Sequence, residues 1–296
     1  MFDDEATPLP NLSVQQLEYL LAAANHPTRA AAAEQLGVTP SALTQGLTEL
    51  ERRVGLSLFE RRGKFTVLRP QAEQVLDYAR RVIAETRDLK NWTQTELAGT
   101  SGQIRLGTVD AVAVHHRANE IREFHKSLPK VDLRLTVAPS GQLLEALFDG
   151  ALDIVACVEP EIIPDGLSSE VFLEEPLFIY APKGKVIRDP KKWGPWVSFP
   201  KGSHTREVIA SSLAALGASY EVTAESNQPE VLAEMVRLGL GWAVLPSAQA
   251  KTGIENLTPI KKTPLAMRRL VLMRRSSSPL DSATQTLVKY LKKIET

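Results

Sequence analysis

Short polar side chains recur within residues 41–48 at the spacing of one helical face, and their chemistry suits contact with nucleic acid. Hydroxyl and carboxamide groups of this size are able to reach base edges or phosphates in a DNA groove. The polar set is Ser41, Thr44, Gln45 and Thr48. The opposite face carries apolar residues at i, i+4, i+7 and i+11, which predicts a buried stripe on an amphipathic helix. That stripe is Leu43, Leu47, Leu50 and Val54.

Two helices joined by a glycine-containing turn would hold this polar face in position. Residues 28–36 form an Ala-rich helical pattern, residues 37–39 read Gly-Val-Thr, and Gly55 is positioned to end the second helix. This order predicts a helix-turn-helix. Residues 58–69 then predict two strands around a basic turn that contains Arg61, Arg62 and Lys64. A helix-turn-helix pattern without such a wing is often only a helical hairpin, so the wing favours DNA binding.

Several residue types at set spacings make this part of the chain resemble a known family. Ala32-Ala33 falls in the predicted second helix, and Leu50-Glu51, Gly55, Leu58-Phe59 and Arg61 follow in order. In this pattern the chain resembles the LysR-type transcriptional regulators, closely over residues 1–65 and more loosely beyond. The resemblance implies a ligand-responsive bacterial transcription factor that binds double-stranded DNA at an inverted repeat. It further implies a dimer or a tetramer, leaves open a contact with RNA polymerase, and implies neither enzyme activity nor a cofactor.

The expected DNA contacts divide into a base-reading group and a phosphate-binding group. Gln45 suits bidentate reading of adenine, whereas the wing residues suit phosphate or the minor groove. Gly46 is expected to remove bulk from the face toward DNA. The complete set is Thr28, Arg29, Thr39, Pro40, Ser41, Thr44, Gln45, Thr48, Arg52, Arg61, Arg62 and Lys64. Because the formal net charge is zero, binding must come from local placement rather than from bulk charge.

The order of predicted elements divides the chain into four parts. They are a winged helix-turn-helix domain (1–69), a linker helix (70–98), a hinge (99–102) and an effector-binding domain (103–296). Alternating strands and helices in the last part predict an α/β fold with parallel sheet, including one helical pattern over 112–127 and separate strands at 168–174 and 177–181. The resemblance implies two periplasmic-binding-protein-like subdomains, I (about 103–178 and 274–296) and II (about 179–273). It also implies that the C-terminal helix packs on subdomain I.

The linker segment predicts a long helix, because residues 71–97 contain neither glycine nor proline. At about 1.5 Å per residue it would be roughly 40 Å long. Side chains at alternating spacings of four and three indicate a heptad seam. The seam is Val75, Ala79, Val82, Thr86, Leu89 and Thr93. The resemblance implies that this helix pairs two copies of the chain; a solitary surface helix is the alternative.

By resemblance, the effector cleft is lined by loops that each lead into a helix, where free backbone N–H groups and positive dipole ends favour a carboxylate. Ser140, Ser203 and Thr205 add hydroxyl donors, although helix capping is an equal interpretation for Ser203 and Thr205. Asp110 either caps the next helix or meets an amine, which makes an amino acid a variant of the expected small carboxylate-bearing metabolite. The expected lining is Thr108, Val109, Asp110, Ala111, Ser140, Gly141, Pro200, Lys201, Gly202, Ser203, His204, Thr205 and Asn227.

Two other classes of function are weighed against this one. An enzyme would need a catalytic group, but His115, His116 and His125 lack the spacing and local carboxylate of a zinc site. Ser203-His204 lacks the glycines of a nucleophile elbow. We therefore expect neither a catalytic site nor a metal site. A DNA-binding or architectural protein that needs no effector is the nearer alternative.

Cysteine usage and hydropathy indicate the compartment. Cys157 is the single cysteine and lies in an apolar run, so we expect a buried structural thiol and no disulfide. No apolar leader or membrane-length run is present in the sequence. We therefore expect a cytoplasmic protein without a membrane partner.

Overall fold

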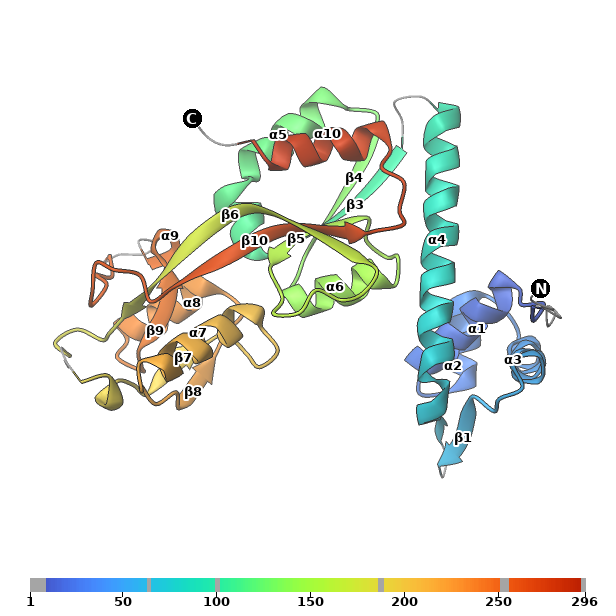
Figure 1. Ribbon diagram of the computed structural model, residues 1–296, viewed down its shortest axis with the longest axis horizontal. Coiled ribbons are helices and arrows are strands. Elements are labelled where there is room, and N and C mark those ends of the chain that lie inside the picture. The colour runs from blue at the N-terminus through green and yellow to red at the C-terminus, as the bar shows by residue number, and fades with distance from the viewer. Residues whose placement is uncertain (1–8, 63–64, 99–101, 186–188, 251–255, 294–296) are drawn as a thin grey trace, which may run out of the picture. The chain divides into compact units, whose positions relative to one another are not determined.

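The computed structural model describes residues 9–62, 65–98, 102–185, 189–250 and 256–293. The chain forms two compact units, the first made mainly of residues 1–91 and the second mainly of residues 92–296. The first unit contains three helices, a two-stranded hairpin and most of a long helix (Figure 1). Its elements are α1 (Val14–Asn25), α2 (Arg29–Leu36), α3 (Pro40–Val54), β1 (Phe59–Arg62), β2 (Phe65–Leu68), η1 (Pro70–Ala72) and α4 (Glu73–Ala98).

The three short helices begin and end at residues whose side chains or backbone satisfy the free helix ends. Ser13 caps α1 through a capping box with Gln16. Thr28 and Thr39 accept hydrogen bonds from the backbone N–H of the third residue of α2 and of α3. Gly37 and Gly55 end α2 and α3 with φ of 66° and 75°. The predicted helix-turn-helix is therefore confirmed, with the boundaries expected from its caps.

The core of the first unit buries the predicted apolar face of α3 and a stripe of α4. The buried side chains include Leu43, Leu47 and Leu50 from α3 with Leu76, Ala79 and Ile83 from α4. Gly46 lies on the side of α3 that packs against α1, because an added Cβ would lie 2.4 Å from Cδ2 of Tyr19. The expectation that Gly46 clears space toward DNA is wrong; it clears space for the Tyr19 ring.

A carboxylate joins α3 to the wing. Oε1 of Glu51 accepts hydrogen bonds from the backbone N–H groups of Leu58 at 2.7 Å and Phe59 at 3.3 Å. Leu58 is fully buried and the hairpin pairs Phe59 with Leu68. This contact gives a physical reason for the spacing between Leu50-Glu51 and Leu58-Phe59. It holds the wing in place at the end of α3.

The predicted heptad seam is wrong at Ala79. Ala79 is fully buried in the core of its own unit, and Val75 and Val82 pack partly against that core. Among the side chains of α4 that the structure describes, the large apolar ones that remain exposed are Tyr78 at 43%, Leu89 at 59% and Trp92 at 39%. Any pairing face on the described part of α4 therefore lies along these three residues.

The second unit is built on a six-stranded sheet in the order β4-β3-β5-β10-β6-β9, with a separate β7-β8 pair. The strands are β3 (Gly102–Thr108), β4 (Val131–Val137), β5 (Ile154–Val158), β6 (Leu167–Tyr180), β7 (Trp196–Ser198), β8 (Val222–Glu225), β9 (Ala243–Pro246) and β10 (Ala266–Arg275). The helices are η2 (Val112–His116), α5 (Ala118–Ser127), α6 (Ser140–Phe148), η3 (Pro190–Lys192), α7 (His204–Ala215), α8 (Pro229–Arg237), α9 (Ser247–Ala250) and α10 (Ser282–Leu291).

The sheet is mixed, which corrects the expected parallel sheet. β3 is parallel to β4 and β5, whereas β10 is antiparallel to both β5 and β6. Residues 167–180 form the single long strand β6 instead of two strands. The pattern expected as one helix over 112–127 is a π-helical turn followed by α5, with Arg117 N–H bonded to the carbonyl of Val112 at 2.8 Å.

Two hydrophobic cores divide the second unit into two subdomains that share the long strands β6 and β10. One core gathers side chains from β3, β5, α5 and α10, and the other gathers Trp196 and Trp242 with side chains of α7 and α8. Phe124 of α5 meets Tyr290 of α10 edge-to-face, with ring centroids 6.0 Å apart. The C-terminal helix thus packs on subdomain I as expected, beside α5 (Figure 1).

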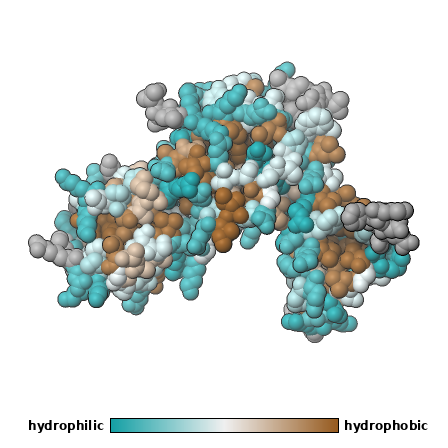
Figure 2. Space-filling model, viewed as in Figure 1, coloured by the Kyte–Doolittle hydropathy of each residue, from teal (hydrophilic) through white to brown (hydrophobic). Residues whose placement is uncertain are grey.

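Hydrophilic residues border the hydrophobic patches on the face of the protein shown in Figure 2. Among the described residues, no helix combines the length and the apolar composition that a membrane span requires.

Candidate functional site

The polar face of α3 is exposed, and its hydroxyl groups are already oriented by the helix. Thr44 donates to the carbonyl of Pro40 at 2.8 Å, and Thr48 donates to the carbonyl of Thr44 at 3.0 Å. The hydroxyls of Thr39 and Ser41 are 3.0 Å apart at the start of the helix. Each oxygen retains lone pairs for an incoming donor. Gln45 is exposed between them, and its carboxamide is available to pair with a base.

The basic residues expected to bind phosphate are partly paired within the chain. Arg52 donates from Nε and Nη2 to Glu49 at 2.7 and 2.6 Å. Hydrogen bonds from Arg52 and Arg53 lower the pKa of Glu49 to about 2. Arg62 forms an exposed pair with Glu60 at 2.6 Å. A phosphate must replace these carboxylates, which costs little because exposed pairs contribute little.

The remaining DNA candidates lie at the edge of this face. The guanidinium of Arg29 lies over the ring of Phe59, 5.0 Å from its centroid. Arg61 is exposed on β1, opposite Thr66 in the hairpin. Thr28 uses its hydroxyl to cap α2. Lys64 lies outside the described residues.

In the second unit, the cleft between the subdomains contains a cavity of about 220 Å³. Three helices, α6, α7 and α8, begin at its wall. Seven of the residues expected from the sequence line it: Val109, Asp110, Ala111, Ser140, Ser203, Thr205 and Asn227. The structure therefore brings together residues from both subdomains, up to 118 positions apart between Val109 and Asn227.

The other expected lining residues lie close by without bordering this cavity. Thr108 is fully buried at the end of β3. Gly141 approaches Gly202 across the cleft, because a Cβ added at Gly141 would lie 3.7 Å from the Gly202 carbonyl oxygen. Lys201 is exposed and Pro200 is half-buried beside Gly202. His204 donates from Nδ1 to the carbonyl of Val158 at 3.0 Å and borders a separate cavity of about 330 Å³.

The helix starts around the 220 Å³ cavity leave donors available to a ligand. Neither Ser203, which precedes α7, nor Gln228, which precedes α8, makes a side-chain capping hydrogen bond. Ser140 is buried, and its hydroxyl oxygen accepts a hydrogen bond from the backbone N–H of Val158 at 3.3 Å. The uncapped N–H groups and the positive helix ends favour an anion at this wall.

A buried cation that the sequence analysis missed also borders the cavity. Arg268 on β10 is 3% exposed and lines the cavity, and its Nη1 donates to the hydroxyl of Thr205 at 3.2 Å. Thr205 therefore positions an arginine rather than capping α7. Strand alternation in the sequence could have indicated that Arg268 is buried. Arg268 precedes the buried Leu270 and Leu272 by two and four positions, so its side chain lies on the same face of the strand.

Glu175 on β6 neutralises Arg268. Its Oε2 accepts from Nε of Arg268 at 2.7 Å, and its Oε1 accepts from Nε2 of His116 at 3.0 Å. Burial alone would raise the pKa of Glu175, but the hydrogen bond from His116 and the charge of Arg268 outweigh burial and lower it. Glu175 is therefore a carboxylate in the folded protein at neutral pH. It compensates the positive charge of the Arg268 guanidinium. The hydroxyl groups and the helix starts at the cavity therefore remain to compensate the charge of a ligand.

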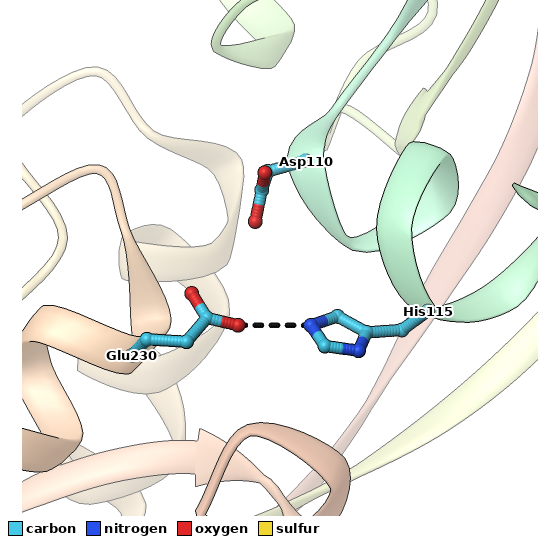
Figure 3. A group of neighbouring side chains, drawn as sticks. All are labelled: Asp110, His115 and Glu230. Carbon is cyan, nitrogen blue, oxygen red and sulfur yellow. Dashed lines mark hydrogen bonds and ion pairs between the residues drawn. The ribbon is translucent and has the colours of Figure 1, made fainter. Parts of the chain in front are cut away.

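A second polar group lies at the other wall of the cleft. His115 donates from Nε2 to Oε1 of Glu230 at 2.8 Å, and the carboxylate of Asp110 points toward this pair (Figure 3). Burial raises the pKa of Asp110, the charge of Glu230 raises it further, and His115 partly offsets both. The sequence predicts Asp110 in the lining of the cleft but gives no sign of Glu230. His115 and Glu230 are 115 positions apart, so no local spacing links them.

The residues considered for an enzyme do not form a catalytic pair. His204 bonds to a backbone carbonyl instead of Ser203. Cys157 is fully buried on β5, its thiol lies 4.0 Å from the sulfur of Met273, and burial raises its pKa to about 12. A thiol in this state is not a nucleophile at neutral pH.

Both parts of the chain match described families. Residues 14–73 match the "Bacterial regulatory helix-turn-helix protein, lysR family" and residues 97–294 match the "LysR substrate binding domain". Similar curated proteins include the regulator EstR of Acinetobacter baylyi, 28% identical over 95% of this chain and 97% of that protein. Another is the DNA-binding transcriptional dual regulator OxyR of Escherichia coli, 26% identical over 95% of each chain.

Solved structures share the fold over most of the chain. A full-length OxyR variant from Pseudomonas aeruginosa aligns with a TM-score of 0.67 at 20% identity, over 95% of each chain. Full-length CbnR complexed with its target DNA aligns with a TM-score of 0.60 at 19% identity, over 95% of this chain and 99% of that one. With one family matched over residues 97–294 and a second over residues 14–73, the chain belongs to the LysR family of transcriptional regulators.

Proposed function

We propose that this regulator binds an inverted-repeat operator and responds to a small carboxylate-bearing metabolite held in the 220 Å³ cavity. The observation that carries the proposal is the convergence of three helix starts with the hydroxyls of Ser140 and Ser203 at one small cavity. Helix starts stabilise anions in protein sites. A cavity of this volume suits a ligand of only a few heavy atoms.

The carboxylate is assigned to the wall formed by Ser140, Ser203 and Thr205. Ser203 offers a hydroxyl that is not used for capping, and Arg268, which is paired with Glu175, holds the hydroxyl of Thr205 in place. The opposite wall contains Asp110, whose charge suits an ammonium group. A zwitterion such as an amino acid is therefore the variant of this ligand class that uses both walls.

On DNA, we propose that α3 enters the major groove with Ser41, Thr44 and Gln45 toward base edges. The wing residues Arg61 and Arg62, together with Lys64, would bind phosphate or the minor groove. Two heads joined through α4 would read two half-sites about one helical turn apart, at roughly 34–36 Å. Assembly into a tetramer and a contact with RNA polymerase extend this proposal. The full-length relative CbnR, whose structure contains its target DNA, supports the placement of the first unit on DNA.

Two alternatives are less well supported by the residues of this chain. An effector-independent DNA-binding or architectural protein would have no use for uncapped helix starts around a polar cavity. Some relatives carry the name "Hydrogen peroxide-inducible genes activator". A thiol-based response to peroxide does not suit this chain, because its one cysteine is fully buried and has a pKa raised to about 12.

Ligand binding is tested with the full-length protein by a thermal-shift screen of anionic, zwitterionic and cationic metabolites, followed by calorimetry on each hit. Ser203→Ala should weaken a carboxylate ligand roughly tenfold or more, because a hydrogen bond to a charged group contributes about 1.5–3 kcal/mol. Ser211→Ala is the matched control, since Ser211 is exposed later on α7 and bonds only to the carbonyl of Val208. Binding restricted to amines without a carboxylate, or equal affinity in both variants, would overturn the proposal.

A further inference from the structure

Three side chains of metal-binding type converge between the two subdomains. Asp110 and His115 come from the segment that follows β3, and Glu230 comes from the start of α8 in the other subdomain (Figure 3). One potential ligand atom from each of the three lies within 4.8 Å of the other two. All three side chains are half-buried rather than fully exposed.

The π-helical turn brings Asp110 and His115 to the same side of their segment. Residues 112–116 form this turn, which is closed by the bond from Arg117 N–H to the carbonyl of Val112. A π turn contains more residues than an α turn, so side chains five positions apart share a face. π turns inside helices occur frequently at functional sites. Here the turn aims both side chains at the same point across the cleft, where Glu230 enters.

The donor set selects among cations. Ca²⁺ and Mg²⁺ prefer all-oxygen ligands, whereas an imidazole nitrogen suits zinc, iron, nickel and copper. Two carboxylates with one neutral imidazole neutralise a divalent ion. At zinc–ligand distances of about 2.0–2.2 Å, ligand atoms in a tetrahedral site lie roughly 3–4 Å apart. The separation of 4.8 Å or less therefore needs only a small closing movement.

We propose that Asp110, His115 and Glu230 bind one divalent transition-metal ion of the zinc type, which joins the two subdomains across the cleft. The ion replaces the hydrogen bond between His115 Nε2 and Glu230, and the proton that leaves Nε2 is taken by Nδ1 or by solvent. It also offsets the charges of the two neighbouring carboxylates, Asp110 and Glu230. Three protein ligands leave a coordination position for water or an effector carboxylate.

Metal binding requires only these three side chains, whereas its effect on DNA binding rests on the proposed function. Because the ligands come from both subdomains, a bound ion favours the closed cleft and stabilises the effector-bound arrangement. Zn²⁺ should therefore increase the affinity for a carboxylate effector, and the effector should increase the affinity for Zn²⁺ by the same factor.

The test uses full-length protein treated with chelator and then titrated with Zn²⁺ by calorimetry, and with Co²⁺ by visible absorption. We expect one equivalent to bind, with a Co²⁺ spectrum of nitrogen and oxygen ligation. His115→Ala and Glu230→Gln should each weaken binding by about 100-fold or more, beyond the loss typical of an outer-shell partner. Asp110→Asn, which preserves side-chain size, should do the same without lowering the thermal stability of the metal-free protein.

Two exposed residues supply matched controls. His125→Ala removes an imidazole from α5, and Glu145→Gln removes a carboxylate from α6, at positions exposed to solvent. Both should leave Zn²⁺ affinity unchanged. Absence of stoichiometric binding, or equal loss in His125→Ala and His115→Ala, would overturn the metal site. If the protein does not bind Zn²⁺ but still binds a carboxylate ligand, the metal site is wrong and the proposed effector site is retained. The two proposals can therefore fail separately.

Discussion

Arg268 and Glu175 are direct partners across the antiparallel β10–β6 ladder and form an ion pair that is almost completely buried. The pair lies between the part of β10 that pairs with β5, residues 270–273, and the part of β6 that pairs with β9, residues 177–180. It therefore marks the place where the two shared strands pass from one subdomain to the other. Through Thr205 it also contacts α7, so the effector wall and the crossing strands are joined by one polar network.

Removing one member of this pair should destabilise the second unit strongly. Arg268→Met leaves Glu175 as a buried charge without its guanidinium partner, which typically costs about 3–5 kcal/mol. The double variant Arg268→Met with Glu175→Leu should recover most of that loss, because well-packed apolar residues often replace a buried pair. Urea unfolding monitored by tryptophan fluorescence measures both changes.

The neighbouring arginine provides the control for that measurement. Arg269 is half-exposed and pairs with Glu159 at 2.8 Å on the surface. Arg269→Met should change the free energy of unfolding by less than about 1 kcal/mol. A double variant no more stable than Arg268→Met alone would show that packing at this position, rather than the uncompensated charge, causes the loss.

Acid should weaken the same network. The folded-state pKa of Glu175 is lowered below 4.5, so the unfolded chain binds a proton more readily than the folded protein. The carboxylate therefore contributes stability that is fully present above about pH 4.5 and is lost as the pH falls through the folded-state pKa. The free energy of unfolding measured from pH 7 downward should decline below this point, and less steeply in Glu175→Gln. Parallel curves for the two proteins would contradict this assignment.

Local signals predicted the first unit well, because its caps, turn glycines and apolar stripe all lie within a few residues of one another. Contacts between residues that are far apart in the sequence could not be predicted from such local signals. Glu230 reaches His115 only because α8 and η2 face each other across the cleft, and no sequence spacing encodes that approach. The error at Ala79 has a different cause. A helix that packs on its own head and, as we propose, also pairs with a second copy would carry two overlapping apolar patterns.

Gly46 illustrates a case in which helix propensity gives the wrong sign. Alanine in place of an exposed helical glycine would be expected to stabilise by about 1 kcal/mol. Here the added Cβ would lie 2.4 Å from the Tyr19 ring, so overpacking should make Gly46→Ala destabilising by about 1–3 kcal/mol. Combining it with Tyr19→Leu should reduce that cost. Thermal unfolding of Gly46→Ala, of Tyr19→Leu and of the double variant gives a double-mutant cycle. Additive effects of the two substitutions on the free energy of unfolding would exclude the contact.

Gln45 should carry sequence discrimination, whereas Arg62 should carry affinity. Gln45→Ala is expected to lose about 1–3 kcal/mol on the cognate operator and little on scrambled DNA, because a bidentate contact to adenine is lost. Arg62→Ala should weaken both sequences alike and lower the salt dependence, since a phosphate contact releases counterions. Fluorescence anisotropy across salt concentrations measures these effects, with Gln35→Ala, exposed on α2, as the control. Equal losses on both DNAs for Gln45→Ala would remove it from the base-reading group.

The exposed apolar residues of α4, which include Leu89 of the predicted seam, should form the dimer contact. Leu89 is 59% exposed, whereas Ala79 is fully buried within its own unit, so Leu89→Asp should weaken pairing without disturbing the core of the head. Two joined heads gain effective concentration on a two-half-site operator, and a monomer loses that gain. Sedimentation velocity should show a lower-order species, and operator affinity should fall while binding to one half-site is unchanged. If Leu89→Asp sediments and binds the operator like the unmodified protein, α4 does not join the heads through this face.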